Sequence, residues 1–455
     1  MTPEEEVQLR AEVQSLRDLN AQLRAEVVAL QTLLEEAEER TAELEAKSSP
    51  SRRLGKANRP KAEGPKAARR PRAKDQSHGR KRCEVVTRQE EHRVERCPDC
   101  GHKLHKPQVA WRREVVELPP PTTVEVTEHV VYKGYCQHCT GWKYATLPDK
   151  GVVVGQRRFG VRLMALVGYL SAGLRLPCRE IQQYLRTVHQ LTLSVGAVVD
   201  LLRGLAAEGQ TAVAEIKAQV QHSAIVHADE TGWREDGQNG YIWVFSTPGE
   251  QGVRYYLYRQ SRGQSVVEEV LGETFRGVLA SDYYCAYNVY RGRHQRCWSH
   301  LSRDLHALKE EHAAETEVLA WAEAVQALYD EGQTFARGQP CQAEREKRYV
   351  SLVERAVELG LRYAQKEHPC RALAKRLLRH QDELFQFILV ADLRADNNLA
   401  ERSLRPLVVI RKISGGSRSP AGSQTRMDLA TLFGTWKARG LDPLPQCRQL
   451  LGANS

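Results

Sequence analysis

The first 46 residues carry apolar side chains at every seventh position, in two interleaved series. One series consists of Leu9, Leu16, Leu23, Leu30, Ala37 and Leu44, and its partner of Val13, Asn20, Val27 and Leu34. This heptad pattern predicts a coiled-coil zipper over residues 1–46, and the single Asn20 among apolar positions favours a parallel homodimer in one register. An amphipathic helix packed on the chain's own body is the alternative.

A second helical pattern occupies residues 151–215. The segment "LPCREIQQYLRTVHQ" is followed by "LTLSVGAVVDLLRGL", in which Ser194 is suited to cap the second helix. Two helices joined by a tight turn predict a helix-turn-helix-like DNA-binding domain, with Ser194 to Asp200 offered to the DNA. The pattern fits ordinary helical packing equally well. That stretch is not notably basic, which weakens the DNA-binding interpretation.

Apolar, β-branched runs dominate residues 216–302. The runs "SAIVHAD", "GYIWVFST" and "VRYYLY" follow one another at hairpin distance, which predicts a three-stranded antiparallel meander. A crossover helix, "SRGQSVVEEVLG", leads to a fourth strand, "GVLASDYY", which such a crossover places parallel to its neighbour. If the fourth strand lies beside the first, Asp229 and Asp282 meet at one edge of the sheet. This order of elements is that of a ribonuclease-H-like core.

The pattern of apolar positions changes back to a helical period over residues 303–391. Two strongly amphipathic segments, "EVLAWAEAVQALYDEG" and "CRALAKRLLRHQDELFQFILV", lie in this range. We therefore expect a helical insertion that interrupts the core, with residues 392–455 supplying its second part. The whole chain is predicted to be a multidomain α/β protein.

The net charge of +10 comes from one short tract. Residues 51–82 hold 13 Lys or Arg against Glu63 and Asp75, and the rest of the chain is close to neutral. Its Pro, Gly and basic composition cannot form a core, so residues 47–82 are predicted to be a disordered linker. A tether that binds phosphates by counterion release is favoured over a merely solvated linker.

Composition also bears on location. No apolar run reaches the length of a membrane span, and the acidic start "MTPEEEVQLR" is unlike a secretory signal. Eleven cysteines, an odd number, favour a reducing compartment. We expect a cytoplasmic, nucleoid-associated bacterial protein without a membrane partner.

Two Cys-x-x-Cys pairs stand within residues 83–150. Cys97 and Cys100 lie in "RCPDCGHKL", and Cys136 and Cys139 lie in "YCQHCTGW". Four thiolates at this spacing predict a structural zinc ribbon, with free thiols or an iron–sulfur site as alternatives. The intervening Val- and Thr-rich stretch is expected to supply its strands.

Two adjacent aspartates repel each other at neutral pH unless a cation lies between them. Mg²⁺ or Mn²⁺ suits Asp229 and Asp282, because a hard cation takes a few carboxylates and keeps sites for phosphate oxygens and water. A third acidic group usually completes a two-metal site. The residues alone leave four candidates for it, Glu273, Glu310, Asp396 and Glu401.

Four blocks of the sequence resemble the signatures of DDE transposases of the insertion-sequence sixty-six type. They are "HADETGWREDGQNGYIWVFST", "SDYYCAYN", "QRCWSHLSRDL" and "DNNLAERSLRPLVVIRKISGGSRSPAG". The resemblance implies a catalytic, Mg²⁺-binding triad of Asp229, Asp282 and Glu401, with Glu401 on a helix beginning near Asp396. It also places Cys297 and His300 of "CWSH" in a family motif, for which a structural role is favoured over a second metal site.

Basic residues follow Glu401 closely. We expect five of them to bind DNA: Arg402, Arg405, Arg411, Lys412 and Arg418. All but Arg402, together with Arg426, are expected to do so from a flexible loop. By the resemblance the protein is expected to be a transposase that cleaves the ends of its element and joins the 3′-hydroxyl to target DNA, with accessory proteins of the same element as candidate partners. A DNA-binding regulator without cleavage activity and a ribonuclease H acting on RNA–DNA hybrids are the rival interpretations.

Overall fold

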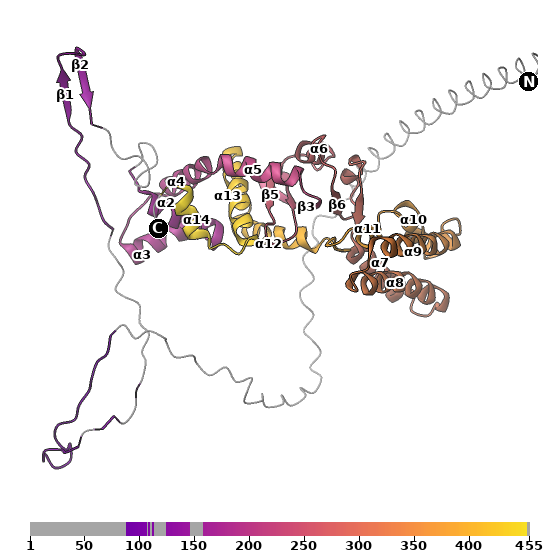
Figure 1. The fold of residues 1–455 in the computed structure, drawn as a ribbon, viewed down its shortest axis with the longest axis horizontal. Helices are drawn as coiled ribbons and strands as arrows, with labels where there is room; N and C mark the ends of the chain where they lie inside the picture. Colours follow the sequence, from indigo (N-terminus) through magenta and orange to yellow (C-terminus); the bar gives the residue numbers. More distant parts are fainter. Residues whose placement is uncertain (1–87, 107, 110–111, 113–123, 146–157, 453–455) are drawn as a thin grey trace, which may run out of the picture. The chain divides into compact units, whose positions relative to one another are not determined.

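The computed structural model describes residues 88–106, 108–109, 112, 124–145 and 158–452 (Figure 1). The predicted zipper (1–46) and basic linker (47–82) lie outside the described residues. The chain divides into two units, residues 1–117 and residues 118–455, which are described separately.

Each predicted cysteine knuckle has local backbone structure of its own. In the first unit Arg96 and Lys103 form an isolated antiparallel bridge around the Cys97 pair. In the second unit the antiparallel strands β1 (Lys133–Cys136) and β2 (Gly141–Tyr144) flank the Cys136 pair. The prediction that the Val- and Thr-rich stretch supplies the strands is wrong for residues 124–132, which form none. Strand β1 instead ends at Cys136 and β2 begins at Gly141, so the tight turn of the knuckle joins the two strands.

A five-stranded sheet forms the centre of the second unit, in the order β5-β4-β3-β6-β7. Its strands are β3 (Ile225–Glu235), β4 (Gln238–Ser246), β5 (Arg254–Arg259), β6 (Val278–Ser281) and β7 (His294–Arg296). The predicted meander is confirmed, since β3, β4 and β5 pair antiparallel, and β6 lies beside β3 and parallel to it. Helix α6 (Ser265–Leu271) is the predicted crossover.

Strand β7 was not predicted. It pairs parallel to β6, yet its three residues are all polar, so no apolar run marks it in the sequence. Its side chains are buried because they find polar partners: His294 Nε2 lies 2.8 Å from Ser281 Oγ, and Arg296 pairs with Glu383 at 2.7 Å.

Alternating side chains give the sheet two covered faces. Trp243 and Phe245 of β4 pack into a hydrophobic cluster with α6 and the helices that precede the sheet. Ile242 and Val244 point the other way, into a cluster with helix α12 (Asn398–Ser414). Helix α13 (Pro420–Ala438) also packs against β5.

The helices before the sheet share its first hydrophobic cluster. They are α2 (Val161–Gly168), continued by the π-helical turn Tyr169–Gly173, α3 (Cys178–His189), α4 (Val195–Glu208) and α5 (Gln210–Gln221). Ser194 caps α4 as predicted, because its side chain accepts a hydrogen bond from the Ala197 N–H at 3.0 Å. The last helix, α14 (Pro443–Leu450), packs on α2.

Five helices separate β7 from α12 and lie together beyond the β6–β7 side of the sheet (Figure 1). They are α7 (Trp298–Glu311), α8 (Thr316–Arg337), α9 (Gln342–Tyr363), α10 (Arg371–Arg379) and α11 (Gln386–Leu389). Trp298, Trp321 and Leu352 are fully buried in a cluster of their own, which reaches Val278 and Ala280 of β6. The helical character predicted for residues 303–391 is confirmed, with breaks between the helices.

Candidate active site

Asp229 and Asp282 come from neighbouring parallel strands. His227 of β3 stands opposite Ala280 of β6, and each aspartate follows two residues later on its own chain segment. The two therefore continue the same register, and Asp282, the first residue beyond β6, lies close enough to raise the pKa of both Asp229 and Glu230. One detail of the prediction is wrong: β3 runs on to Glu235, so Asp229 lies inside the strand, where only the pairing with β6 has ended.

The electrostatics of Asp229 are those of a site that lacks positive charge. Burial raises the pKa of Asp229 to about 8, and the nearby carboxylates of Glu230, Asp282 and Glu401 add to the rise. The Glu230 N–H, which donates to Asp229 Oδ1 at 2.9 Å, opposes it. Crowded carboxylates of this kind are stabilised in the ionised form by a bound divalent cation. The donor set therefore fits Mg²⁺ or Mn²⁺.

Glu230 points to the opposite face of the sheet and has partners of its own. Its carboxylate accepts a hydrogen bond from Tyr287 and pairs with Arg262 at 2.7 Å. Burial and the charge of Asp282 raise the pKa of Glu230, and the Tyr287 hydroxyl and the Arg262 guanidinium oppose that rise. Glu230 is thus occupied by protein groups, whereas Asp229 faces helix α12.

Helix α12 is held against β3 by Asn397, the residue before its first turn. The Asn397 side chain donates to the Ala228 carbonyl at 2.7 Å and contacts His227 Nδ1 at 3.2 Å, and its N–H donates to Cys297 Sγ at 3.1 Å. Burial lowers the pKa of His227 to about 4, so the imidazole is neutral. These bonds fix the first turn of α12, and with it Glu401, beside Asp229.

His227 was not predicted as part of this arrangement. The signal for it is the strand alternation itself: His227 and Asp229 are two residues apart and share the face that Asn397 contacts.

Of the four acidic candidates, Glu401 is the one that acts on Asp229. Asp396 instead accepts from the Asn398 N–H at the start of α12, at 3.1 Å, and pairs with Arg394 at 3.0 Å. Glu310 lies on the exposed side of α7 near His306, and Glu273 is exposed beyond α6.

Glu401 also lies beside Cys297 and His300 at the start of α7. One ligand atom of each of these three residues lies within 4.8 Å of the other two, the one such group of three among the described residues. The carboxylates of Asp229, Asp282 and Glu401 therefore do not all lie within 4.8 Å of one another.

The predicted DNA-binding residues divide into two kinds. Arg402, Arg405, Lys412 and Arg418 are exposed. Arg411 instead turns inward, where its guanidinium donates to Thr231 Oγ1 at 3.1 Å and to the Gly232 carbonyl of β3.

The prediction of a flexible basic loop is wrong. Arg402 to Lys412 lie on helix α12, and Arg426 lies on α13, where it is partly buried and bonds Ser171 at 3.3 Å. Arg418 alone lies in the short connection between the two helices. The Ser and Gly residues of this segment suggested a loop, but its apolar positions follow the period of a helix.

Comparison with known families bears on this geometry. A model described as "Transposase IS66 family" matches residues 156–425, which is more than half of the chain and contains all three acidic residues. The chain belongs to the IS66 transposase family. A second model, the "zinc-finger binding domain of transposase IS66", matches residues 95–140 and contains the four cysteines of the predicted ribbon.

A relative of this IS66-family chain is the "Uncharacterized protein y4qI" of Sinorhizobium fredii, 29% identical over 212 residues. The match covers 43% of this chain and 39% of the relative, so the chain spans about two fifths of the length of the curated relative that it matches.

Each cysteine pair of the zinc-finger region has the backbone of a metal knuckle. Backbone N–H groups of Cys100 and Asp99 face the Cys97 sulfur and lower its pKa. The N–H groups of Cys139 and His138 do the same for Cys136, with Cys139 N lying 3.4 Å from Cys136 Sγ. Both sulfurs are therefore prepared to act as thiolates, the form in which cysteine binds zinc.

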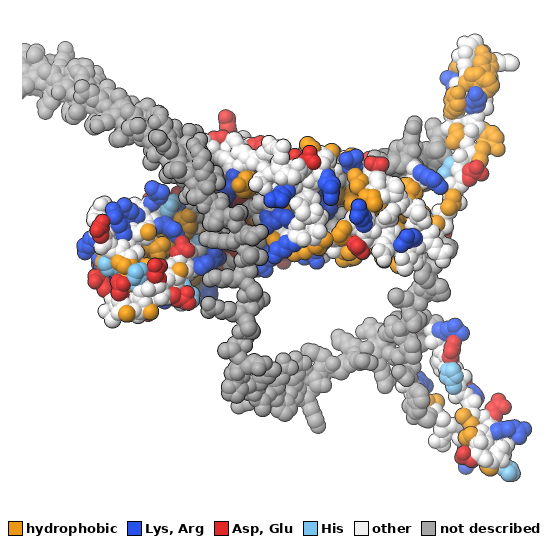
Figure 2. Space-filling view, turned by 180° about the vertical axis from the view of Figure 1, so that it is seen from behind, with side chains coloured by type: hydrophobic (Ala, Val, Ile, Leu, Met, Phe, Trp, Pro, Cys, Tyr) orange, Lys and Arg blue, Asp and Glu red, His pale blue; other side chains and the backbone are white. Residues whose placement is uncertain are grey.

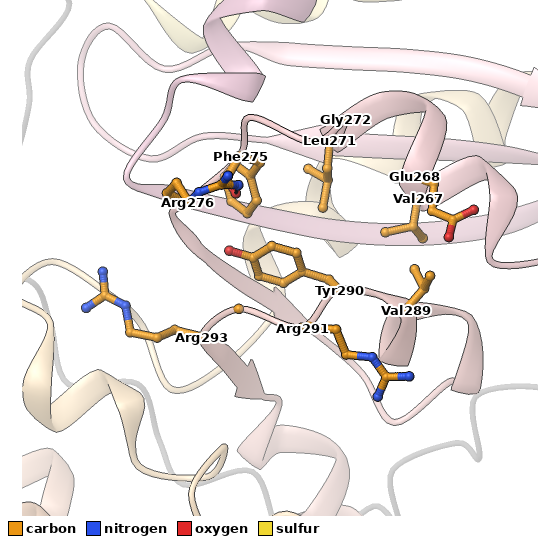
Figure 3. A pocket seen from close by; sticks show the side chains of 11 residues that line it. Val267, Glu268, Leu271, Gly272, Phe275, Arg276, Val289, Tyr290, Arg291 and Arg293 are labelled. Atoms are coloured by element: carbon orange, nitrogen blue, oxygen red, sulfur yellow. Dashed lines mark hydrogen bonds between the residues drawn. The ribbon is translucent and has the colours of Figure 1, made fainter. Parts of the chain in front are cut away.

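A separate hollow of the IS66-family chain lies between α6 and the segment before β7 (Figure 3). Tyr290 crosses it, packing on Phe275 and donating to the Gly277 carbonyl at 2.6 Å. Arg276, Arg291 and Arg293 lie at its rim, with guanidinium groups that diverge (Figure 3). None of the three acidic residues lines it, so this hollow is not the candidate active site.

Figure 2 shows one face of the molecule, on which Lys and Arg side chains are spread over the central body and acidic ones are fewer. No helix in the described part of the chain is both long enough and apolar enough to cross a membrane.

Proposed function

We propose that this chain is the transposase of an insertion sequence, which cleaves the ends of its element and joins the 3′-hydroxyl to target DNA. The observation that carries the proposal is the convergence of Asp229, Asp282 and Glu401 from two parallel strands and one helix within the family-matched region. The strand order, three antiparallel strands followed by two parallel ones, supports a ribonuclease-H-like core.

The three carboxylates would hold Mg²⁺ or Mn²⁺. Such ions, when bound, stabilise the attacking and leaving oxygens of an in-line phosphoryl displacement. Asp229 and Asp282 are suited to bind from the sheet, because each spends one carboxylate oxygen on a backbone N–H of Glu230 or Tyr284 and keeps the other. Glu401 is suited to bind from the helix, since its carboxylate lies close enough to Asp229 to raise the pKa of that residue.

The exposed cations extend away from this centre along α12. Arg402 and Arg405 follow Glu401 within one turn, and Lys412 and Arg418 lie at and beyond the end of the helix. Phosphate contacts of this kind position DNA without reading its sequence. Recognition of the element's ends falls to other parts, for which we propose the zinc ribbon and the α3–α4 pair, with the zipper joining two subunits.

The test is a strand-transfer assay with a labelled element end and Mg²⁺. Asp229→Asn should lower the rate more than about 100-fold, because a metal ligand supports several kcal/mol of transition-state stabilisation. Asp304→Asn on α7 is the matched control, since Asp304 pairs with Arg376 on the insertion. Equal rates for wild type and Asp229→Asn would overturn the triad. Cleavage of an RNA–DNA hybrid alone would favour a ribonuclease H, and binding without cleavage a regulator.

A further inference from the structure

Cys297, His300 and Glu401 form a cluster that the proposed Mg²⁺ site does not explain. Cys297 is the residue before α7, His300 lies in the first turn of α7, and Glu401 lies in the first turn of α12. A potential ligand atom of each lies within 4.8 Å of those of the other two. The combination of thiol, imidazole and carboxylate is one that Zn²⁺ binds and that Mg²⁺, which prefers oxygen ligands, does not.

Two atoms of this cluster are buried without a hydrogen-bond partner. They are His300 Nδ1 and Glu401 Oε1. Leaving polar atoms buried and unpaired costs free energy, so native proteins rarely do it without a reason. A cation bound between the two side chains would give both atoms a partner.

The backbone around Cys297 repeats the pattern of the two zinc-finger knuckles. The N–H groups of Ser299 and His300, two and three residues on, face the Cys297 sulfur, as the corresponding groups do at Cys97 and Cys136. The Asn397 N–H adds a third donor at 3.1 Å. Three N–H groups thus surround the Cys297 sulfur, as two do at each knuckle sulfur.

We propose that Cys297, His300 and Glu401 bind a transition-metal ion of the Zn²⁺ type, at a site separate from the cysteine ribbon. The ligands would be the Cys297 thiolate, one His300 imidazole nitrogen and one Glu401 carboxylate oxygen, with a fourth position open to water. Binding releases the thiol proton to solvent. The ion ties the first turns of α7 and α12 together, and so positions Glu401.

Zinc content measured on the full chain tests this proposal. Substitution of Cys97 and Cys136 by serine disables the ribbon and leaves the new site untouched. That variant should still retain about one zinc per chain. Adding Cys297→Ser or His300→Ala should remove it, with a loss of affinity greater than about 100-fold, because even outer-shell substitutions cost 10–100-fold.

Cys370→Ser is the matched control, since Cys370 is also buried and also precedes a helix, α10. It should leave the zinc content unchanged. Cobalt substitution gives a second readout, because Co²⁺ at a site with one thiolate should show visible absorption that Cys297→Ser removes. If the ribbon-disabled chain holds no zinc and takes up no Co²⁺, the proposal is overturned, and His300 then serves only as a neighbour of Glu401. The result does not depend on strand-transfer activity, so either proposal can fail alone.

Discussion

Asp229 and Glu230 are adjacent in sequence and serve different purposes because a strand directs them to opposite faces. Glu230 accepts a hydrogen bond from Tyr287 and forms an ion pair with Arg262. Burial, with the carboxylates of Glu230, Asp282 and Glu401, raises the pKa of Asp229 to about 8. The difference between the two residues is therefore one of surroundings.

The raised pKa of Asp229 predicts how stability depends on pH when metal is chelated. The folded carboxyl has a pKa of about 8, against an ordinary value of 3.8, so between these pH values the folded state binds more protons than the unfolded one. The free energy of unfolding in EDTA should therefore fall as pH rises from about 4 to about 8. Each unit of pKa difference is worth about 1.4 kcal/mol, so the difference of about 4 units sets an upper limit of about 6 kcal/mol on the fall.

Urea unfolding of wild type and Asp229→Asn at several pH values checks this prediction. The variant should become the more stable protein at pH 8 in EDTA, and saturating Mg²⁺ should reverse the order, because the cation stabilises the ionised form. Parallel pH profiles for the two proteins in EDTA would contradict the prediction.

At the scale of elements, helix α12 is attached to β3 at both ends. Asn397 bonds β3 before the first turn, and after the last turn Ser417 continues the contact. The Ser417 N–H donates to the Arg234 carbonyl at 2.8 Å, and Ser417 Oγ accepts from Trp233 Nε1 at 3.1 Å. Contacts at both ends of α12 therefore hold Glu401 in its position relative to Asp229.

The second attachment of α12 to β3 requires a glycine at position 416. Its φ of +126° favours glycine, and a Cβ there would lie 2.1 Å from the Arg234 carbonyl oxygen. Gly416→Ala should therefore destabilise the protein by strain of about 1–3 kcal/mol and, in addition, by displacing the chain from β3. Gly415→Ala is the matched control, because Gly415 also has a positive φ, +75°, but open space around its Cβ position.

Chemical denaturation of the two alanine variants gives the comparison. Gly415→Ala should cost about 1–2 kcal/mol and Gly416→Ala clearly more. Equal losses would mean that the contact between residue 416 and β3 contributes nothing to stability.

The elements that could be predicted from the sequence are those with a strong local signal. Strands β3 to β6 are apolar runs, and Ser194 stands where a capping residue is expected. Strand β7 and the Gly416 turn could not be predicted, because their burial depends on partners such as Glu383 and Arg234, which lie far away in the sequence or act through the backbone.

The residues of the site could also be predicted only as far as local sequence signals indicate them. The Asp229–Asp282 pair follows from strand order, which local patterns indicate. Glu401 is separated from Asp282 by 119 residues of mostly helical insertion, so only the family resemblance selected it. The approach of Cys297 and His300 to Glu401 depends on how α7 and α12 begin in space, which no sequence spacing reveals.

At the scale of the whole molecule, the zipper remains a prediction from the heptads of residues 1–46. Deleting these residues should convert a dimer to a monomer, with about half the mass in light scattering, while zinc content stays the same. Asn20→Val should leave a dimer or a higher oligomer, because the polar residue restricts the oligomeric state rather than driving association. An unchanged mass after the deletion would contradict a dimer held by this segment.

The central claim is that Asp229 and Asp282, brought together by parallel strands, form a divalent-metal site. Titration of the zinc-loaded full chain with Mn²⁺, followed by electron paramagnetic resonance, tests it most directly. Wild type should bind Mn²⁺, Asp229→Asn and Asp282→Asn should each weaken binding more than about tenfold, equivalent to about 1.4 kcal/mol, and Asp304→Asn should bind as wild type does. Mn²⁺ binding by Asp229→Asn that is as tight as in wild type would contradict the account.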